Sequence, residues 1–307
     1  LLIDTYKGFQ HDNPMLYGAS IAFYMIFSLP ALLIFAVYIA GYFYGEEAVK
    51  GTLYTQIATH VGEGIAKQIQ NILRNVNLNE SGAVAKTIGF ATLIFSATTV
   101  FVNIQLALNE IWGVRPKPQR GWLKLIIDRL FSFIIVVSLG LILIAFQIID
   151  LALKVSEDFL YRFLSEYTVY LMQITTWVIN IGIVTLVFAL VFKLLPDAKI
   201  RWKNTLIGAL VTALLFNLGK YLISLLLQND PLSDTYGTAG ALVMILIWVY
   251  YSSVIFLFGA EFTQIYSRHY DQGIRPSEHA VKVETRKVQM DQDGTIKEVK
   301  GKKAKKF

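Results

Sequence analysis

The chain contains no cysteine among its 307 residues, and only 16% of its residues are charged. The absence of cysteine excludes disulfide bonds, thiol nucleophiles and cysteine-ligated metal sites. The charged fraction is well below the roughly 25% of an ordinary soluble domain, whereas 55% of the residues are hydrophobic. This composition predicts a membrane protein.

The sequence also lacks the short motifs of common catalytic and nucleotide-binding sites. GxxxxGK[ST], GxSxG, HExxH and a strand-linked GxGxxG are all missing. The four histidines fall in the terminal segments or in a predicted external loop, without the spacing of metal ligands. The residues therefore predict no enzyme, no catalytic residue, no metal site and no cofactor. The histidines are His11, His60, His269 and His279.

Six apolar runs are long enough to cross a bilayer, which takes about 20 helical residues. We therefore expect an all-α fold: a polytopic membrane protein with six transmembrane helices in a domain of residues 1–267. The predicted spans are 18–44, 87–110, 123–150, 168–195, 204–227 and 238–266.

The positions of Lys and Arg predict the orientation of the bundle. Residues 268–307 hold eleven Lys and Arg against six Asp and Glu, which accounts for five of the net charges of +6. The loops 111–122 and 193–203 are also basic, whereas 228–237 has neither Lys nor Arg. By the positive-inside rule both termini are expected in the cytoplasm. Residues 268–307 are expected to form a basic, flexible cytoplasmic tail.

Two features depart from a plain apolar helix. The first external loop, about 45–86, repeats apolar residues every three or four positions, which predicts an amphipathic helix. That helix would lie in the headgroup layer or cap the bundle. Pro30 breaks the first span and frees a carbonyl near Ile26. The break is either a static kink or a place where a ligand binds.

Weakly polar residues recur at helical spacing on four predicted spans. Lipid cannot form hydrogen bonds with them, so they should face the bundle interior or a wet cavity. Small and polar residues also serve ordinary helix packing. A shared cavity and packing alone both stay open. The stripes are Thr92, Ser96, Thr99, Asn103, Ala107 and Glu110; Arg129, Ser132, Gly140, Gln147 and Asp150; Thr205, Ala209, Ala213, Asn217, Lys220 and Ser224; and Tyr250, Ser253, Glu261 and Gln264.

The charged members of these stripes fall into two layers by depth. Asn109, Glu110, Arg129 and Glu261 lie near the predicted inner ends of their helices. Arg129 is the expected counter-ion of Glu261 or Glu110, since a buried charge needs one. Lys220 lies in the outer half of its span, so it is not expected to pair with Glu261.

Together these residues form the candidate substrate path or gate. Asn103 and Asn217, nearer mid-depth, would contact the polar part of a substrate. The alternative is that both charged layers only sit at the membrane interfaces, with Lys220 snorkelling outward. Gly259 and Ala260 would let another helix come close beside Glu261. The full set is Asn103, Asn109, Glu110, Arg129, Asn217, Lys220 and Glu261.

Four stretches together resemble the YihY/BrkB family of bacterial inner-membrane proteins, some once labelled ribonuclease BN. They are GASIAFYMIFSLPALL (18–33), ALNEIWGV (107–114), LPDAKIRWKNTLIGAL (195–210) and YGTAGALVMILIWVYYSSVIFLFGAE (236–261). The resemblance covers most of residues 1–267, and the tail beyond 270 lies outside it. Relatives often carry a Phe before the proline that is missing in Ser28-Leu29-Pro30. The resemblance implies an all-helical protein of the inner membrane.

The expected function is that of a transporter or flippase-like protein for a lipid or other amphiphile, anionic substrates included. The alternative is a membrane scaffold or envelope-integrity factor that transports nothing. We do not expect a membrane-tethered ribonuclease, because the short cytoplasmic loops offer no acid–base or metal constellation. The expected partners are membrane lipids and an amphiphilic substrate, without specific nucleic acid, and a homo-oligomer is left open.

Overall fold

The computed structural model is mostly helical, as the sequence predicts. It describes residues 1–28, 83–117, 166–227 and 240–283, together with 51, 54–55, 70, 134, 138, 289–290 and 296–297. Within these ranges lie six helices: α1 (Leu2–His11), a helix at Pro14–Ser28, α5 (Ala83–Ile111), α7 (Glu166–Leu194), α8 (Trp202–Leu227) and α10 (Gly240–Tyr270).

Three of these helices are long and apolar enough to cross a membrane. The segments are Trp177–Leu194 of α7, Trp202–Ile223 of α8 and Val243–Tyr270 of α10. Each is apolar nearly all round, as expected for a helix between lipid and protein. The whole helices α7, α8 and α10 match three of the predicted spans within a few residues.

The other predicted spans are covered only in part by the described residues. α5 runs through the predicted span 87–110, and the helix Pro14–Ser28 covers the start of 18–44. Whether these two cross the membrane stays a prediction. The span 123–150, the amphipathic loop 45–86 and Pro30 lie outside the described ranges, apart from single residues and the start of α5 at 83–86. The neighbouring Ser28 is buried, and its hydroxyl donates a 2.6 Å hydrogen bond to the carbonyl of Ser96 on α5.

α8 and α10 cross at a pair of reciprocal glycine–threonine contacts. A Cβ at Gly208 would lie 1.9 Å from Oγ1 of Thr263, and a Cβ at Gly259 would lie 1.8 Å from Oγ1 of Thr212. Each threonine hydroxyl donates a 2.7 Å hydrogen bond to the glycine carbonyl four residues earlier in its own helix. The two backbones can come this close only because the glycines have no side chain. The prediction that Gly259 admits a neighbouring helix is confirmed.

Aromatic rings fill the space between α5, α7 and α10. The ring of Phe192 lies 5.1 Å from that of Phe256 and 6.2 Å from that of Trp112, measured between centroids. Trp112 and Phe192 are fully buried. Edge and tilted ring contacts at these distances add to the burial of apolar surface. This cluster fixes the end of α5 against the transmembrane helices.

Short strands join the helix ends on one side of the molecule. β1 (Val114–Pro116) pairs antiparallel with β4 (Ala280–Lys282), and β2 (Ala198–Lys199) pairs antiparallel with β3 (Arg275–Pro276). β1 follows α5, β2 connects α7 to α8, and β3 and β4 follow α10. We call this side, made of β1–β4 and the helix ends that they join, the strand-paired end. A separate pair, β5 (Gln289–Met290) and β6 (Ile296–Lys297), lies farther along the chain.

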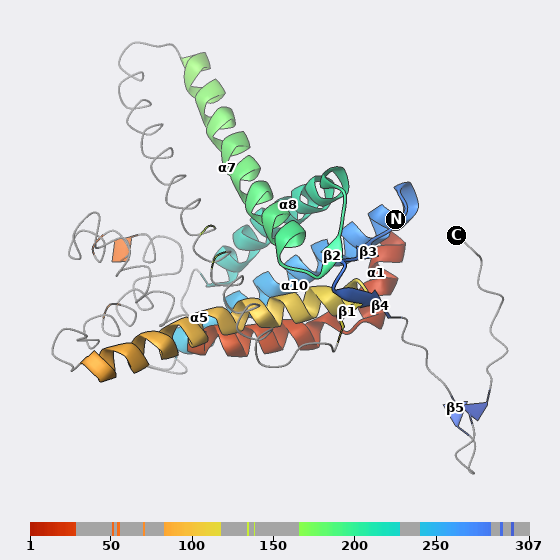
Figure 1. Ribbon diagram of the computed structural model, residues 1–307. Helices are drawn as coiled ribbons and strands as arrows, with labels where there is room; N and C mark the ends of the chain where they lie inside the picture. The colour runs from red at the N-terminus through yellow and green to blue at the C-terminus, as the bar shows by residue number, and fades with distance from the viewer. Residues whose placement is uncertain are drawn as a thin grey trace.

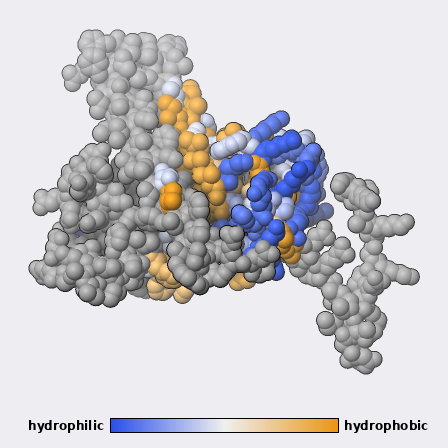
Figure 2. Space-filling model, in the orientation of Figure 1, coloured by the Kyte–Doolittle hydropathy of each residue, from blue (hydrophilic) through white to orange (hydrophobic). Residues whose placement is uncertain are grey.

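Figure 1 shows that α1 lies at the strand-paired end, beside the end of α10. In the same orientation, Figure 2 shows hydrophilic residues gathered at this end and apolar residues farther along the helices, including on α7. The boundary between the two is what the surface of a membrane protein shows where it leaves the hydrocarbon layer.

The first part of the predicted flexible tail belongs to this folded end. α10 continues to Tyr270, and residues 275–282 supply β3 and β4. Backbone hydrogen bonds tie them in: the amide of Ser277 donates to the carbonyl of Asp197 at 2.9 Å, and that of Lys117 to the carbonyl of His279 at 2.8 Å. A polar composition suggests a mobile segment, but strands of two or three residues leave no alternating pattern in the sequence.

Candidate functional site

Glu261 is almost fully buried on α10, with 2% of its surface exposed. Its Oε2 atom is buried and has no hydrogen-bond partner among the residues that the structure describes. A carboxylate that lacks a partner inside a protein is unfavourable, because it has lost its hydration without compensation. Glu261 is therefore the described residue whose position packing alone explains least.

Helix α1 covers this carboxylate. A Cβ at Gly8 would lie 2.1 Å from Oε1 of Glu261, so a larger residue here would force the Glu261 side chain or α1 to shift. On either side of Gly8, Thr5 is fully buried and Phe9 places its ring 5.3 Å from that of Phe258 on α10. The spacing of Thr5, Gly8 and Phe9 puts them on one face of α1. That face is laid over Glu261.

Ala260, the residue before Glu261, is bound through its backbone carbonyl by Trp112. The indole N–H of Trp112 donates a 3.1 Å hydrogen bond to the carbonyl of Ala260. Next to it, the amino group of Lys282 on β4 donates a 2.7 Å hydrogen bond to the carbonyl of Trp112. The ALNEIWGV motif, α10 and the segment after α10 thus meet directly beside the buried carboxylate.

The sequence did not identify the charged groups that the structure places near Glu261. Asp12, at the C-cap of α1, and Arg268 on α10 are the described charges that act on it. Glu110 instead lies at the surface, with Oε2 3.4 Å from an Arg115 nitrogen and both side chains more than one-third exposed. Arg129, the expected counter-ion, lies outside the described residues, so its pairing with Glu261 or Glu110 stays a prediction.

Asn109 holds the turn between α7 and α8 with its side-chain amide. Its Nδ2 atom donates to Oδ2 of Asp197 at 2.9 Å, and its Oδ1 atom accepts from the backbone amide of Asp197 at 2.9 Å. Gln105 on the preceding turn of α5 donates to the same carboxylate oxygen at 3.3 Å. Asn109 is 4% exposed. In this structure it therefore locks two helix ends together.

Lys220 lies at a different level of the bundle from Glu261. Gly208 and Gly259 mark the crossing near Glu261, whereas Gly219, next to Lys220, contacts Tyr251. Some ten residues of α10 separate the two levels, roughly 15 Å at 1.5 Å per residue. This agrees with the expectation that Lys220 does not pair with Glu261.

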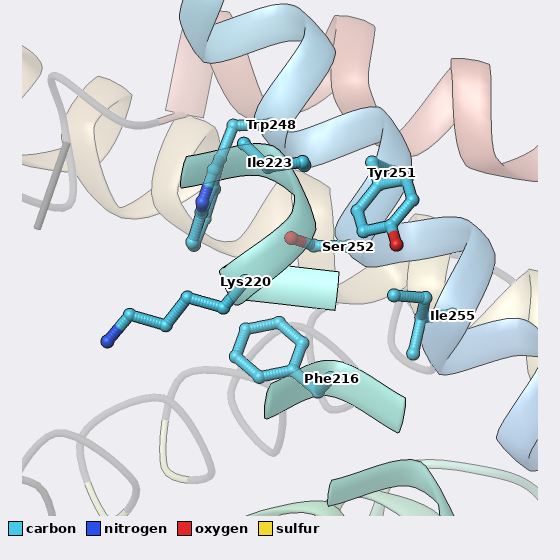
Figure 3. A pocket seen from close by; sticks show the side chains of 7 residues that line it. All are labelled: Phe216, Lys220, Ile223, Trp248, Tyr251, Ser252 and Ile255. Carbon is cyan, nitrogen blue, oxygen red and sulfur yellow. The ribbon is translucent and has the colours of Figure 1, made fainter. Parts of the chain in front are cut away.

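Lys220 borders a narrow pocket between α8 and α10. The pocket has no room for a water molecule. Figure 3 shows Trp248, Tyr251 and Ile255 facing this space, while the amino group of Lys220 points away from it. The pocket is therefore a packing gap between apolar side chains in this structure.

The mid-depth asparagines use their amides within their own helices. Asn103 donates a 2.9 Å hydrogen bond to the carbonyl of Thr99, and Asn217 donates one of the same length to the carbonyl of Ala213. On α8, Ala209 and Ala213 are fully buried. Small stripe residues are thus buried between helices, and a role of Asn103 or Asn217 in a substrate path stays a prediction.

Residues 5–284 match the family described as "Virulence factor BrkB". The chain belongs to the BrkB family. It is 28% identical over 222 residues to a UPF0761 membrane protein of Idiomarina loihiensis, a match that covers 71% of this chain and 72% of the relative. It is 25% identical over 267 residues to a UPF0761 membrane protein of Psychromonas ingrahamii, covering 85% and 86%. No solved structure matches the chain.

The BrkB match corrects one expectation. The resemblance seen in the sequence was expected to stop near residue 270, but the match continues to residue 284. The reason is visible in the fold, because β3 and β4 end at Lys282 and pair with β2 and β1. The names of the relatives and the apolar helices agree that this BrkB-family chain is a membrane protein.

The strand-paired end of the BrkB chain also holds a polar cluster around Asp271, which was not foreseen from the sequence. Asn204, which is buried, donates to Oδ2 of Asp271 at 3.0 Å and to the hydroxyl of Ser267 at 3.2 Å. Arg201 lies 2.8 Å from Oδ1 of Asp271. The backbone N–H of Gln272, together with these partners, holds the pKa of Asp271 below its ordinary value.

Opposite that cluster, Lys199 and Glu278 form an exposed ion pair of 2.8 Å. The hydrogen bond and charge of Lys199 lower the pKa of the Glu278 carboxyl. Within the described ranges of the chain, His, Asp and Glu nowhere form a group of three that could hold a metal ion. The polar groups at this end therefore act on one another and on the backbone.

Sequence reasoning missed Gly8, Asp197, Asn204 and Asp271. Asp197 stands inside the quoted LPDAK stretch, so a motif did contain it. Nothing in the sequence shows that Asn109, 88 positions earlier, would be its partner. Gly8 carried no signal, because a glycine in a short helix is common and the group that it faces is distant in sequence.

Proposed function

We propose that this BrkB-family chain is a non-enzymatic transporter or flippase-like protein that moves a lipid or other amphiphile across the bacterial inner membrane. The observation that carries this proposal is Glu261: a buried carboxyl on a membrane-spanning helix, with an oxygen that no described group satisfies. Ionisable groups at such places are expensive, and they are usually retained because a transport or relay step uses them.

In this proposal the strand-paired end faces the cytoplasm, with both termini on that side. Basic residues support the assignment, since this end exposes Arg115, Lys117, Lys199, Arg201 and Arg275. Cytoplasmic surfaces of membrane proteins carry such an excess of Lys and Arg. Glu261 then lies near the cytoplasmic end of its helix, under α1.

The described helices meet at packed crossings, so the proposed path opens by movement of helices. Glu261 is covered by α1, a helix of only ten residues that packs mainly on α10. In this proposal α1 is the element that moves. Substrate would enter beside Glu261 when this cover is displaced. Arg129 is proposed as the counter-ion of the carboxylate once this cover is displaced, and Asn103 and Asn217, nearer mid-depth, would contact the substrate's polar part.

A membrane scaffold without transport is the second candidate. The reciprocal contacts of Gly208 with Thr263 and of Gly259 with Thr212 favour it, since they pack α8 and α10 tightly against each other. The amides of Asn103 and Asn217 are likewise bound within their own helices. A scaffold needs a rigid bundle, which these contacts supply, but it does not need the unsatisfied carboxyl of Glu261.

A flux assay in proteoliposomes separates the two. Vesicles with the purified chain are compared with empty vesicles for translocation of fluorescent phosphatidylethanolamine, phosphatidylglycerol and phosphatidylcholine, and for uptake of small anions. We expect the wild type to accelerate at least one of these fluxes and Glu261→Gln to reduce it. Thr185→Val is the matched control, because Thr185 Oγ1 is the other described buried polar atom without a partner.

The control should leave flux unchanged, because it removes an unsatisfied group that carries no charge. If no member of the panel moves faster than in empty vesicles, the transport proposal is wrong and the scaffold remains. If Thr185→Val lowers flux as much as Glu261→Gln, the effect reflects the bundle as a whole and not the carboxyl.

A further inference from the structure

α1 covers the carboxyl group of Glu261. Its buried face consists of Thr5, Gly8 and Phe9, and the backbone at Gly8 passes directly over the Glu261 carboxyl. Beside this buried face, Leu2, Ile3 and Tyr6 are between 57% and 70% exposed. Apolar residues exposed on a short helix at the edge of the hydrocarbon layer suit the membrane interface. α1 thus has one side on the carboxyl and another, exposed and partly apolar, that suits the membrane interface.

The site beneath α1 suits a neutral, protonated Glu261 carboxyl far better than an ionised carboxylate. An ionised carboxylate accepts hydrogen bonds through two oxygens, and here one oxygen is sealed off without a donor. Burying a charge in that way is much less favourable than burying a neutral carboxyl group.

Two charged groups of the packed elements bear on this site. Asp12, at the C-cap of α1, opposes a negative charge on Glu261, and Arg268, from α10, favours it. His11 lies 2.9 Å from Asp12 and, when protonated, weakens the effect of that aspartate. Arg268 is exposed, so water screens its attraction. Neither group replaces the missing hydrogen-bond donor at Oε2.

We propose that Glu261 is a proton-binding site and that α1 is its lid. The carboxyl holds a proton while α1 is docked. When α1 lifts, the O–H bond breaks, the proton passes to water and the carboxylate becomes hydrated. Because docking binds a proton that undocking releases, a fall in pH favours the docked state and a rise in pH favours the open state. If the transport function proposed above holds, the proton is its coupling ion; this last step rests on that function.

The position of α1 can be measured directly, because the chain has no cysteine and takes labels only where they are introduced. Spin labels at Lys7→Cys on α1 and Lys203→Cys on α8 use two exposed positions. Electron–electron distance measurements on the full chain in nanodiscs then report docking across a pH series. In the wild type we expect a short distance at low pH, and an open population that grows up to about tenfold per pH unit as the pH rises.

Three variants make the measurement decisive. Glu261→Gln keeps the shape and removes the ionisation, so the short distance should persist at every pH. Gly8→Leu fills the space over the carboxyl and should give the open distance at every pH. Asp12→Asn should keep a pH-dependent transition, because in this proposal Asp12 modulates the site and does not form it.

A wild-type distance that does not change with pH would overturn the proposal, and so would a Glu261→Gln variant that responds to pH as the wild type does. Loss of the transition in Asp12→Asn alone would assign the proton to Asp12 and overturn it as well. The outcome is independent of flux: a lid that opens with pH in a chain that moves no lipid leaves the proton site intact and removes only the coupling role.

Discussion

Replacing Gly208 by alanine should separate α8 from α10 at their crossing. The added Cβ would lie 1.9 Å from Oγ1 and 2.8 Å from Cβ of Thr263, which is roughly 1.5 Å short of ordinary van der Waals contact. Thr263 cannot easily turn aside, because its hydroxyl is bound to the carbonyl of Gly259 at 2.7 Å. The helices must therefore move apart, and Gly259 and Thr212 would lose their contact too.

The size of the effect follows from two opposing terms. Overpacking a tight site costs about 1–3 kcal/mol, and two coupled contacts place this one at the upper end. Alanine in place of glycine returns about 1 kcal/mol through helix propensity. We therefore expect a net loss of about 2 kcal/mol in the free energy of unfolding. Gly182→Ala on α7 is the control, since no described atom lies within 4 Å of a Cβ there.

The assay is an SDS titration of the protein in bicelles, followed by circular dichroism, which needs no thiol dye. Gly182→Ala should be neutral or slightly stabilising. Adding Thr263→Ala to Gly208→Ala removes the atom at 1.9 Å and should restore part of the loss, a coupling that a double-mutant cycle measures. If Gly208→Ala proves as stable as Gly182→Ala, the close approach of the two helices is wrong.

Three further predictions concern the strand-paired end. Asn109→Ala removes both hydrogen bonds to Asp197 and should lower the free energy of unfolding by about 2 kcal/mol in the same titration. A variant as stable as the wild type would contradict the role of Asn109 in joining the two helix ends. Trp112→Phe keeps an aromatic ring but loses the bond to the Ala260 carbonyl, and a loss of about 1–2 kcal/mol is expected. Because the pKa of Asp271 is lowered in the folded state, its contribution to stability is complete above the ordinary carboxyl range and is lost as the pH falls through the folded value. Thermal melts of wild type and Asp271→Asn should therefore differ at neutral pH and converge in acid, and a constant difference would refute the assignment.

Continuous apolar runs predicted the transmembrane helices well. The expected spans 168–195, 204–227 and 238–266 correspond to α7 at Glu166–Leu194, α8 at Trp202–Leu227 and α10 at Gly240–Tyr270. Length and hydrophobicity are properties of each segment alone, so the sequence contains them in full. The same holds for the relative depth of Lys220 and Glu261, which follows from counting residues along two antiparallel helices.

The surroundings of Glu261 could be predicted only in part. Periodicity showed that it lies on a polar face and that Gly259 makes room beside it. It did not show that Gly8 of α1 would supply the cover, because the choice among packing partners depends on the whole tertiary arrangement. The stripes had the same limit: helical spacing gives the face on which Ala209 and Ala213 lie, but not whether the space in front of that face is filled.

The strand pairs have a consequence for the order in which the chain can be completed during synthesis. β1 ends at Pro116 and β2 at Lys199, but their partners β3 and β4 begin only at Arg275 and Ala280. Until β3 and β4 leave the ribosome, the backbone edges of β1 and β2 have no partner strand. Unpaired edges of this kind accept any compatible strand. The same segment of a second, finished copy is the strand that fits them best, so slow completion of one chain favours an exchange of C-terminal strands between two.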